Sequence, residues 1–70
     1  MKRLTRDING MSALQGIMLN GIANALQRKA NAKKMNITID AFDSQMKKIY
    51  IIAKVTGIIA LTDWAREKKY

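Results

Sequence analysis

The sequence predicts an all-α fold, a small three-helix bundle with helices near residues 12–34, 39–56 and 62–69. The chain has no proline and only four glycines in 70 residues, so little in it interrupts helices. Apolar residues also recur at steps of three and four along much of the chain. A single domain this short buries few side chains. We therefore expect one domain over residues 1–70 that is dimeric or stabilised by a partner.

The first helix is expected to begin after a short basic arm at residues 1–11. Asn9 and Gly10 form a turn pair near the end of this arm. Ser12 lies three residues before Gln15, which is the spacing of a capping box. This pattern predicts a helix that starts at Ser12.

The apolar residues of the first helix form one predicted stripe. Gly21 lies within the stripe, and we interpret it as a point where another backbone approaches closely. The basic residues that follow Leu26 suit the negative end of the helix dipole. The stripe consists of Leu14, Ile17, Met18, Ile22, Ala25 and Leu26.

Residues 36–40 allow two interpretations. The alternation of Ile37 and Ile39 with polar residues is typical of a short strand. Thr38 followed by Asp40 and Asp43 is instead typical of a helix N-terminus, where a hydroxyl caps the first turn and carboxylates face the positive end of the dipole. A lone strand has no pairing partner within one chain. We therefore favour the helix cap.

The central helix is apolar on two sides. Phe42, Met46 and Ile49 share one side, and Ile51 and Val55 lie on the other, so both sides need cover. Gly57 is expected to end this helix, after which Thr62 or Asp63 caps a last helix that Trp64 anchors beside Leu61. The residues expected at a partner or dimer interface are Tyr50, Ile51, Val55, Ile58, Ile59 and Trp64.

The net charge is the strongest indication of function. Thirteen Lys and Arg residues stand against five Asp and Glu, which gives +8 at pH 7. A field of this sign favours phosphate backbones, anionic membranes or acidic protein surfaces. Contacts from these cations to nucleic acid would be mainly to phosphate and independent of base sequence. The predicted nucleic-acid-binding residues are Arg28, Lys29, Lys33, Lys34, Lys47 and Lys48.

The side chains needed for catalysis are scarce. The chain contains no histidine and no cysteine, and helix capping accounts for its scattered carboxylates. The glycines form no phosphate-binding loop. The sequence therefore predicts a protein that is not an enzyme and has no cofactor, metal or small-molecule substrate. The apolar run at residues 49–61 is too short to span a bilayer and contains Lys54, so we expect a cytoplasmic protein.

Residues 35–58, MNITIDAFDSQMKKIYIIAKVTGI, resemble the strand and first helix of ribbon-helix-helix repressors. The resemblance lies in the alternating Ile37 and Ile39, the apolar helix positions that follow, and the closing Gly57. It implies a strand that pairs with its dimer mate and reads bases through Asn36, Thr38 and Asp40. The long helical segment before this stretch and the short helix after it depart from that family.

Three kinds of binding function remain open. The first is a regulatory protein that acts on nucleic acid through its Lys and Arg surface. The second is an inhibitor or antirepressor whose apolar helix face docks on a partner, including a nucleic-acid-binding protein. The third is a membrane-active peptide, which the many Asn, Gln and Asp residues disfavour.

Overall fold

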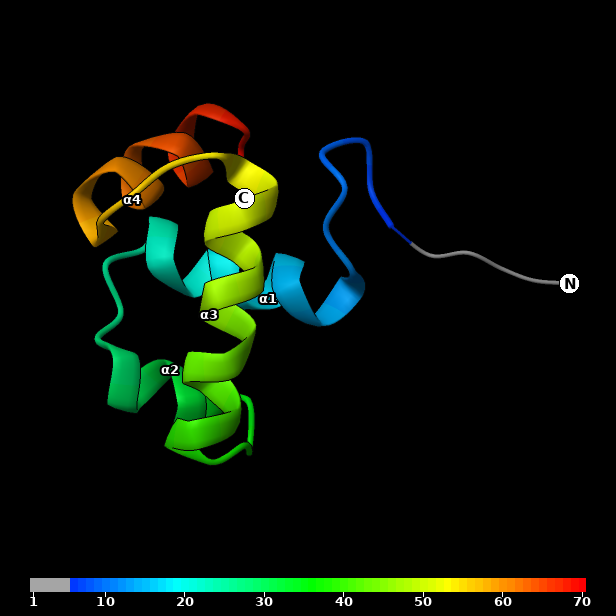
Figure 1. Cartoon of the computed structure of the whole chain (residues 1–70). Helices are drawn as coiled ribbons and strands as arrows, with labels where there is room; N and C mark the ends of the chain where they lie inside the picture. The colour runs from blue at the N-terminus through cyan, green and yellow to red at the C-terminus, as the bar shows by residue number, and fades with distance from the viewer. Residues whose placement is uncertain (1–5) are drawn as a thin grey trace, which may run out of the picture.

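The computed structural model describes residues 6–70, which form four α-helices (Figure 1). They are α1 (Ala13–Ala23), α2 (Arg28–Lys34), α3 (Ile39–Ala53) and α4 (Ile58–Glu67). No strand occurs within residues 6–70, so the all-α prediction is confirmed for this part of the chain. The number of helices differs from the prediction, because the first expected helix is divided into α1 and α2.

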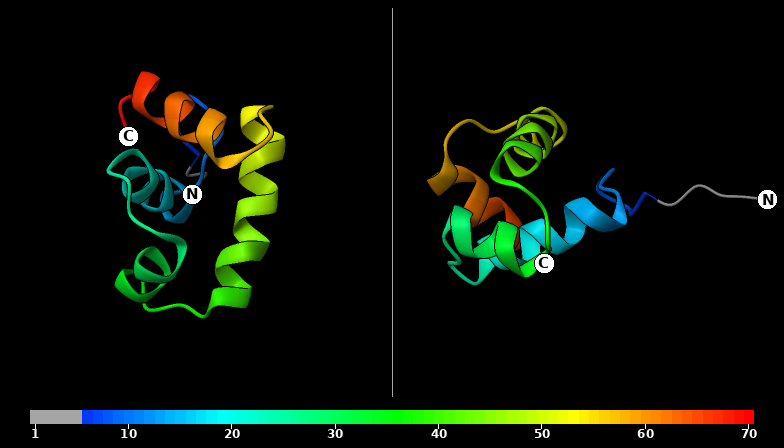
Figure 2. Two further views of the ribbon diagram at one scale, coloured as in Figure 1. Left: turned by 90° about the vertical axis from the view of Figure 1, so that its left-hand side faces the viewer. Right: turned by 90° about the horizontal axis from the view of Figure 1, so that it is seen from below.

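The longest helix, α3, runs beside the other three. Helices α4, α1 and α2 follow one another along it, with α4 near its C-terminal end and α2 near its N-terminal end (Figures 1 and 2). Helices α2 and α4 therefore lie at opposite ends of the molecule, and α1 lies between them. This order separates the surface around α2 from the surface around α4.

The core lies where α1, α3 and α4 meet. Phe42 and Ile49 of α3 have the helical spacing that the sequence predicted for its buried side, and both are buried. Complete burial of one large apolar side chain contributes about 1.5–3 kcal/mol. Seven or so such residues must therefore supply most of the stability of this small domain. The buried apolar residues are Met11, Met18, Leu19, Ile22, Ala32, Phe42, Ile49, Leu61 and Ala65.

Helix α1 begins as predicted but ends much earlier. The Ser12 hydroxyl accepts a hydrogen bond from the Gln15 amide at 3.2 Å, and Gln15 Oε1 accepts one from the Ser12 amide at 3.0 Å, which confirms the capping box. The predicted helix to residue 34 is wrong because the backbone turns at Ala25, whose φ is 65°. The Leu26 amide donates to the Gly21 carbonyl at 2.9 Å, which closes α1 in a Schellman motif.

The turn at Ala25 lets α2 pack against α1 at Gly21. A Cβ atom on Gly21 would lie 2.6 Å from side-chain atoms of Asn31, so the close approach expected at this glycine is made by a side chain of α2 and not by a backbone. Asn31 Nδ2 donates to the Met18 carbonyl at 3.1 Å. The absence of a Cβ at residue 21 thus leaves room for the buried Asn31 amide.

The predicted apolar stripe of α1 is only partly buried. Met18 and Ile22 belong to the core, whereas Leu14, Ile17 and Leu26 are exposed. The buried side is rotated toward Leu19 and Gln15, and Gln15 Nε2 donates to Gln45 Oε1 of α3 at 3.1 Å.

Helix α3 begins at the predicted cap. The Thr38 hydroxyl accepts a hydrogen bond from the Ala41 amide at 3.1 Å, and α3 starts at Ile39. The strand implied by the ribbon-helix-helix resemblance is therefore not formed. Because residues 36–38 are the turn and cap of a helix, their side chains do not project from a ribbon.

The boundary between α3 and α4 differs from the prediction. Helix α3 ends at Ala53 because Lys54 adopts a left-handed conformation with a φ of 59°. Gly57, with a φ of 86°, precedes α4 and does not close α3. Helix α4 consequently begins at Ile58 and not near residue 62, which carries Leu61 into the core.

Residues 6–11, the end of the expected arm, are held against the rest of the fold by hydrogen bonds of Asp7. The Asp7 carboxylate accepts hydrogen bonds from the Asn9 and Met11 amides at 2.9 Å each and from the Tyr70 hydroxyl. Burial acts to raise the pKa of the Asp7 carboxyl, but these hydrogen bonds outweigh it and lower that pKa below its ordinary value. Burial, together with the Asp7 carboxylate, raises the pKa of Tyr70. The part of the arm with Lys2 and Arg3 lies outside the described residues.

In the part of the chain that the structure describes, no helix has the length and apolar character needed to cross a membrane.

Candidate nucleic-acid interface

Helix α2 carries the densest positive charge of the described residues. Its sequence, RKANAKK, contains four cations and no carboxylate. Asn31 and Ala32 are the buried residues of the helix, and every Lys and Arg of α2 is exposed. The neutral side of the helix therefore packs inward and its charged side chains reach solvent. Lys33 and Lys34 occupy the last turn, where their charge is also stabilised by the helix dipole.

A short turn connects α2 to α3. Residues 35–38 separate the two helices, and Asn36 adopts a φ of 58°. The Ile37 amide donates to the Ala32 carbonyl at 3.1 Å and the Asn36 amide donates to the Lys33 carbonyl at 3.0 Å, the two bonds of a Schellman motif. Asparagine tolerates the left-handed conformation better than most residues. Local hydrogen bonds thus fix where α3 begins relative to α2.

The outer side of α3 mixes charge and polarity. Asp40, Ser44, Lys47 and Ile51 follow one another at steps of four and three, so they lie along one side of the helix, and all four are exposed. Lys48 is exposed as well. This side lies away from the buried Phe42 and Ile49. The structure therefore keeps the two predicted lysines of α3 accessible.

One ion pair joins α2 to α3, and no other occurs among residues 6–70. Arg28 Nε lies 3.6 Å from Asp43 Oδ1, with the two side chains 63% and 43% exposed. A pair this exposed contributes about 0–1 kcal/mol. Of the six predicted cations, Arg28 is thus partly compensated by a carboxylate. Lys29, Lys33, Lys34, Lys47 and Lys48 form no ion pair with the described residues.

The remaining cations of the described residues lie mainly near α4. Arg66 lies in the last turn of α4, Lys68 and Lys69 follow it, and Lys54 caps the C-terminal end of α3. Arg66 Nε donates to the Ala23 carbonyl at 2.9 Å and so has a structural role. Net charge alone does not distinguish these cations near α4 from the cations of α2. Only the placement of the two helices at opposite ends distinguishes them (Figure 2).

The structure divides the predicted interface residues into two sets. Tyr50, Val55 and Trp64 are half-buried and packed against the core, and the Trp64 ring stacks on Tyr70 with 5.9 Å between ring centroids. The other three remain exposed around the junction of α3 and α4, at exposed fractions of 75%, 52% and 78% for Ile51, Ile58 and Ile59.

The sequence predicted a short loop between the cations of residues 28–34 and the helix that carries Lys47 and Lys48, but it did not predict that residues 28–34 form a separate helix. A usable indication was present in Ala32, a small buried residue four positions before the left-handed Asn36, with the cap at Thr38 following directly. Small residues allow a turn to pack closely, and Asn commonly follows a helix C-terminus. Ser44, on the outer side of α3, was also not among the predicted residues.

Across residues 6–70, no three acidic side chains gather into a group that could hold a metal ion.

No protein-family model matches this chain, and neither a curated protein nor a solved structure matches it.

Proposed function

We propose that this protein is a non-enzymatic regulator that binds nucleic acid through α2, the turn at residues 35–38 and the outer side of α3. The observation that supports this most is the outward display of four cations on α2 beside a second helix with an accessible polar side. Two helices joined by a turn of three or four residues are the construction of a helix-turn-helix. The segment here has that turn length.

In this proposal the two helices have different tasks. Lys29, Lys33 and Lys34 contact phosphates and supply most of the affinity. The outer side of α3 faces a groove of the duplex, where Lys47 and Ser44 reach base edges or sugar. A phosphate group would repel the Asp40 carboxylate. At a base edge, however, a carboxylate can accept a hydrogen bond from the cytosine amino group. In this arrangement the positive charge of α2 positions the two helices on the duplex, and α3 contacts the bases in the groove.

Charge reversal in α2 tests the proposal. We expect the double variant Lys33→Glu and Lys34→Glu to weaken duplex DNA binding by more than about tenfold, because two phosphate contacts become repulsive. If two contacts are lost, the slope of log affinity against log salt concentration falls by about 1.8, at about 0.9 per phosphate. Fluorescence anisotropy at several salt concentrations measures both quantities, and circular dichroism verifies that the variant is folded.

A matched control reverses two lysines at the other end of the molecule. Lys68→Glu with Lys69→Glu makes the same change in net charge next to α4. We expect this variant to retain most of the affinity and nearly the full salt slope. Equal losses in both double variants would show that the protein responds to total charge and has no defined interface.

The exposed isoleucines favour a second candidate, a protein that docks on a partner or on a second copy of itself. Ile51 and Ile59 are more than 70% exposed, and large exposed apolar side chains are candidates for contact with a partner. An inhibitor or antirepressor would use this region and let its positive charge recognise an acidic surface. If the unmodified protein bound no duplex DNA at low salt, this candidate would replace the first.

A further inference from the structure

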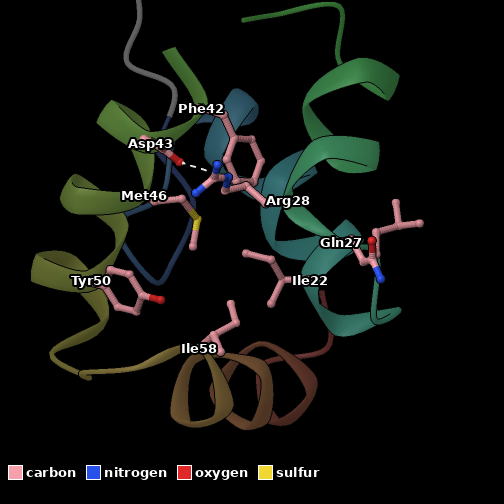
Figure 3. Close-up of a pocket in the computed structure, with 9 residues that line it drawn as sticks. Ile22, Gln27, Arg28, Phe42, Asp43, Met46, Tyr50 and Ile58 are labelled. Carbon is pink, nitrogen blue, oxygen red and sulfur yellow. Dashed lines mark ion pairs between the residues drawn. The ribbon is translucent and has the colours of Figure 1, made fainter. Parts of the chain in front are cut away.

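A cleft opens between α3 and the segment that joins α1 to α2. Its volume is about 350 Å³, and the start of α4 closes one end of it (Figure 3). Pockets that bind small molecules range from about 300 to 1,000 Å³, while a cavity of about 150 Å³ already holds benzene. The cleft is therefore large enough for a ligand of one or two rings.

The wall of the cleft is mostly apolar and comes from three helices. Ile22 of α1, Phe42 and Met46 of α3, and Ile58 of α4 point toward the same space (Figure 3). Phe42 is buried in the core, whereas Ile58 is half exposed at the rim. Methionine adapts its shape to irregular neighbours. This wall suits a compact apolar body, aromatic or branched aliphatic.

Two hydrogen-bond donors, Arg28 and Tyr50, line the same cleft, and the Asp43 carboxylate that pairs with Arg28 lines it as well. Arg28 Nε lies 3.6 Å from Asp43 Oδ1, which is longer than a hydrogen bond. No residue within 6–70 accepts a hydrogen bond from the Arg28 guanidinium or from the Tyr50 hydroxyl, and that hydroxyl points into the cleft (Figure 3). A guanidinium presents paired N–H groups that fit a carboxylate in a bidentate manner. The guanidinium N–H groups that Asp43 does not engage and the Tyr50 hydroxyl can donate hydrogen bonds to acceptor atoms of a ligand.

We propose that this cleft binds a small amphipathic monocarboxylate. The carboxylate accepts hydrogen bonds from Arg28, and the apolar body packs against Phe42, Met46, Ile22 and Ile58. The Tyr50 hydroxyl donates to an acceptor on the ligand. The net charge of +8 on the whole chain favours an anion over a cation, although Asp43 offsets Arg28 within the cleft. The site shares Arg28 with the proposed nucleic-acid surface but does not require nucleic acid to bind, and it contradicts the expectation that the protein has no small-molecule ligand.

A titration in the absence of nucleic acid tests the site and cannot be confused with a failure of DNA binding. The probes are 1-naphthoate and its neutral counterpart 1-naphthalenemethanol, followed by amide chemical shifts of ¹⁵N-labelled protein. We expect naphthoate to saturate with a dissociation constant of about 1 mM or below. It should move the amides around Phe42, Met46 and Ile58 and bind about tenfold more tightly than the alcohol. No saturable shift at about 10 mM naphthoate would overturn the proposal.

Three variants locate the binding. Arg28→Gln should abolish the preference for the acid, whereas Lys29→Gln, with the same charge change on the outer side of α2, should leave it intact. Ile58→Trp should fill the cleft and weaken both probes; its site is at the rim, so the fold tolerates the larger ring. Equal loss in the Arg28 and Lys29 variants, or full binding by Ile58→Trp, would overturn the proposal. Equal binding of acid and alcohol would do so too and would indicate a cleft for an apolar side chain of a partner.

Discussion

The half of the molecule formed by α1 and α4 differs from the half formed by α2 and the outer side of α3. In the first half, Met18, Leu19, Leu61 and Ala65 are fully or almost fully buried, and hydrogen bonds from residues near both helix ends tie it together. In the second half, most side chains are charged and exposed, and the connection between helices includes one weak ion pair. The two halves meet along α3, which contributes its apolar side to the first and its polar side to the second.

This difference shows that stability and recognition are assigned to different surfaces. Apolar burial is the main favourable term in folding and needs continuous contact, which α1, α3 and α4 provide. Phosphate binding needs charge that water can reach, which α2 provides. Because the two requirements occupy different side chains, substitutions should separate them.

The largest expected effect is at the centre of the first half. Leu61→Ala removes a fully buried side chain and leaves a cavity, so we expect the free energy of unfolding to fall by about 2–5 kcal/mol. Urea denaturation at low temperature, followed by circular dichroism, measures the loss. The control is Ile59→Ala on the outer side of the same helix, where we expect a change within about 0.5 kcal/mol. A comparable loss at Ile59 would mean that this outer side is buried against another chain.

A smaller effect is expected at Ala25, where the chain passes from α1 to α2. Ala25 is a left-handed residue with a Cβ, and Ala25→Gly removes strain of about 1–2 kcal/mol while adding freedom to the unfolded chain. We expect a net gain of about 0.5–1 kcal/mol in the free energy of unfolding. Thermal unfolding measures it.

The turn at Asn36 is the natural comparison for the turn at Ala25. Asn36→Gly should change stability less, since asparagine already tolerates this conformation. Ala30→Gly, inside α2, should destabilise by about 1 kcal/mol because its backbone is helical. Stabilisation by all three substitutions, or by none, would show that the left-handed turn at Ala25 carries no strain.

The smallest expected effect concerns the contact between Asp7 and Tyr70. The pKa of Asp7 is lowered in the folded state, so its carboxylate stabilises the fold above the ordinary pKa of 3.8, and this contribution is lost as the pH falls through the folded-state pKa. Asp7→Asn should therefore lower the melting temperature near neutral pH, and the difference from the unmodified protein should shrink below about pH 3.8. Melting curves between about pH 2.5 and 7 measure this.

The exposed Asp63 provides the control, because no hydrogen bond joins its carboxylate to residues 6–70. Asp63→Asn should leave the pH dependence nearly unchanged. An equal change in the two variants would indicate a general effect of net charge and not the contact with Tyr70.

The sequence by itself determined the helical class and two helix starts. The capping box at Ser12 and the cap at Thr38 are local, since the hydroxyl bonds an amide three residues away. The side of α3 that carries Phe42 and Ile49 also followed from helical spacing. The accessible cations of α2 were recognisable from charge, whereas their joint use in a binding surface is still a prediction.

Only the tertiary structure decided where the helices end and which residues lie together. The left-handed residues at the ends of the helices are Ala25, Asn36, Lys54 and Lys69, and none is glycine. Glycine is the strongest local signal for a helix end, so the breaks at Ala25 and Lys54 were not predicted and Gly57 was assigned to the wrong helix.

Ala25 adopts its strained conformation because contacts distant in sequence, such as Asn31 against Gly21, hold α2 on α1. The same packing forms the cleft at Arg28 and Tyr50, which no local pattern could show.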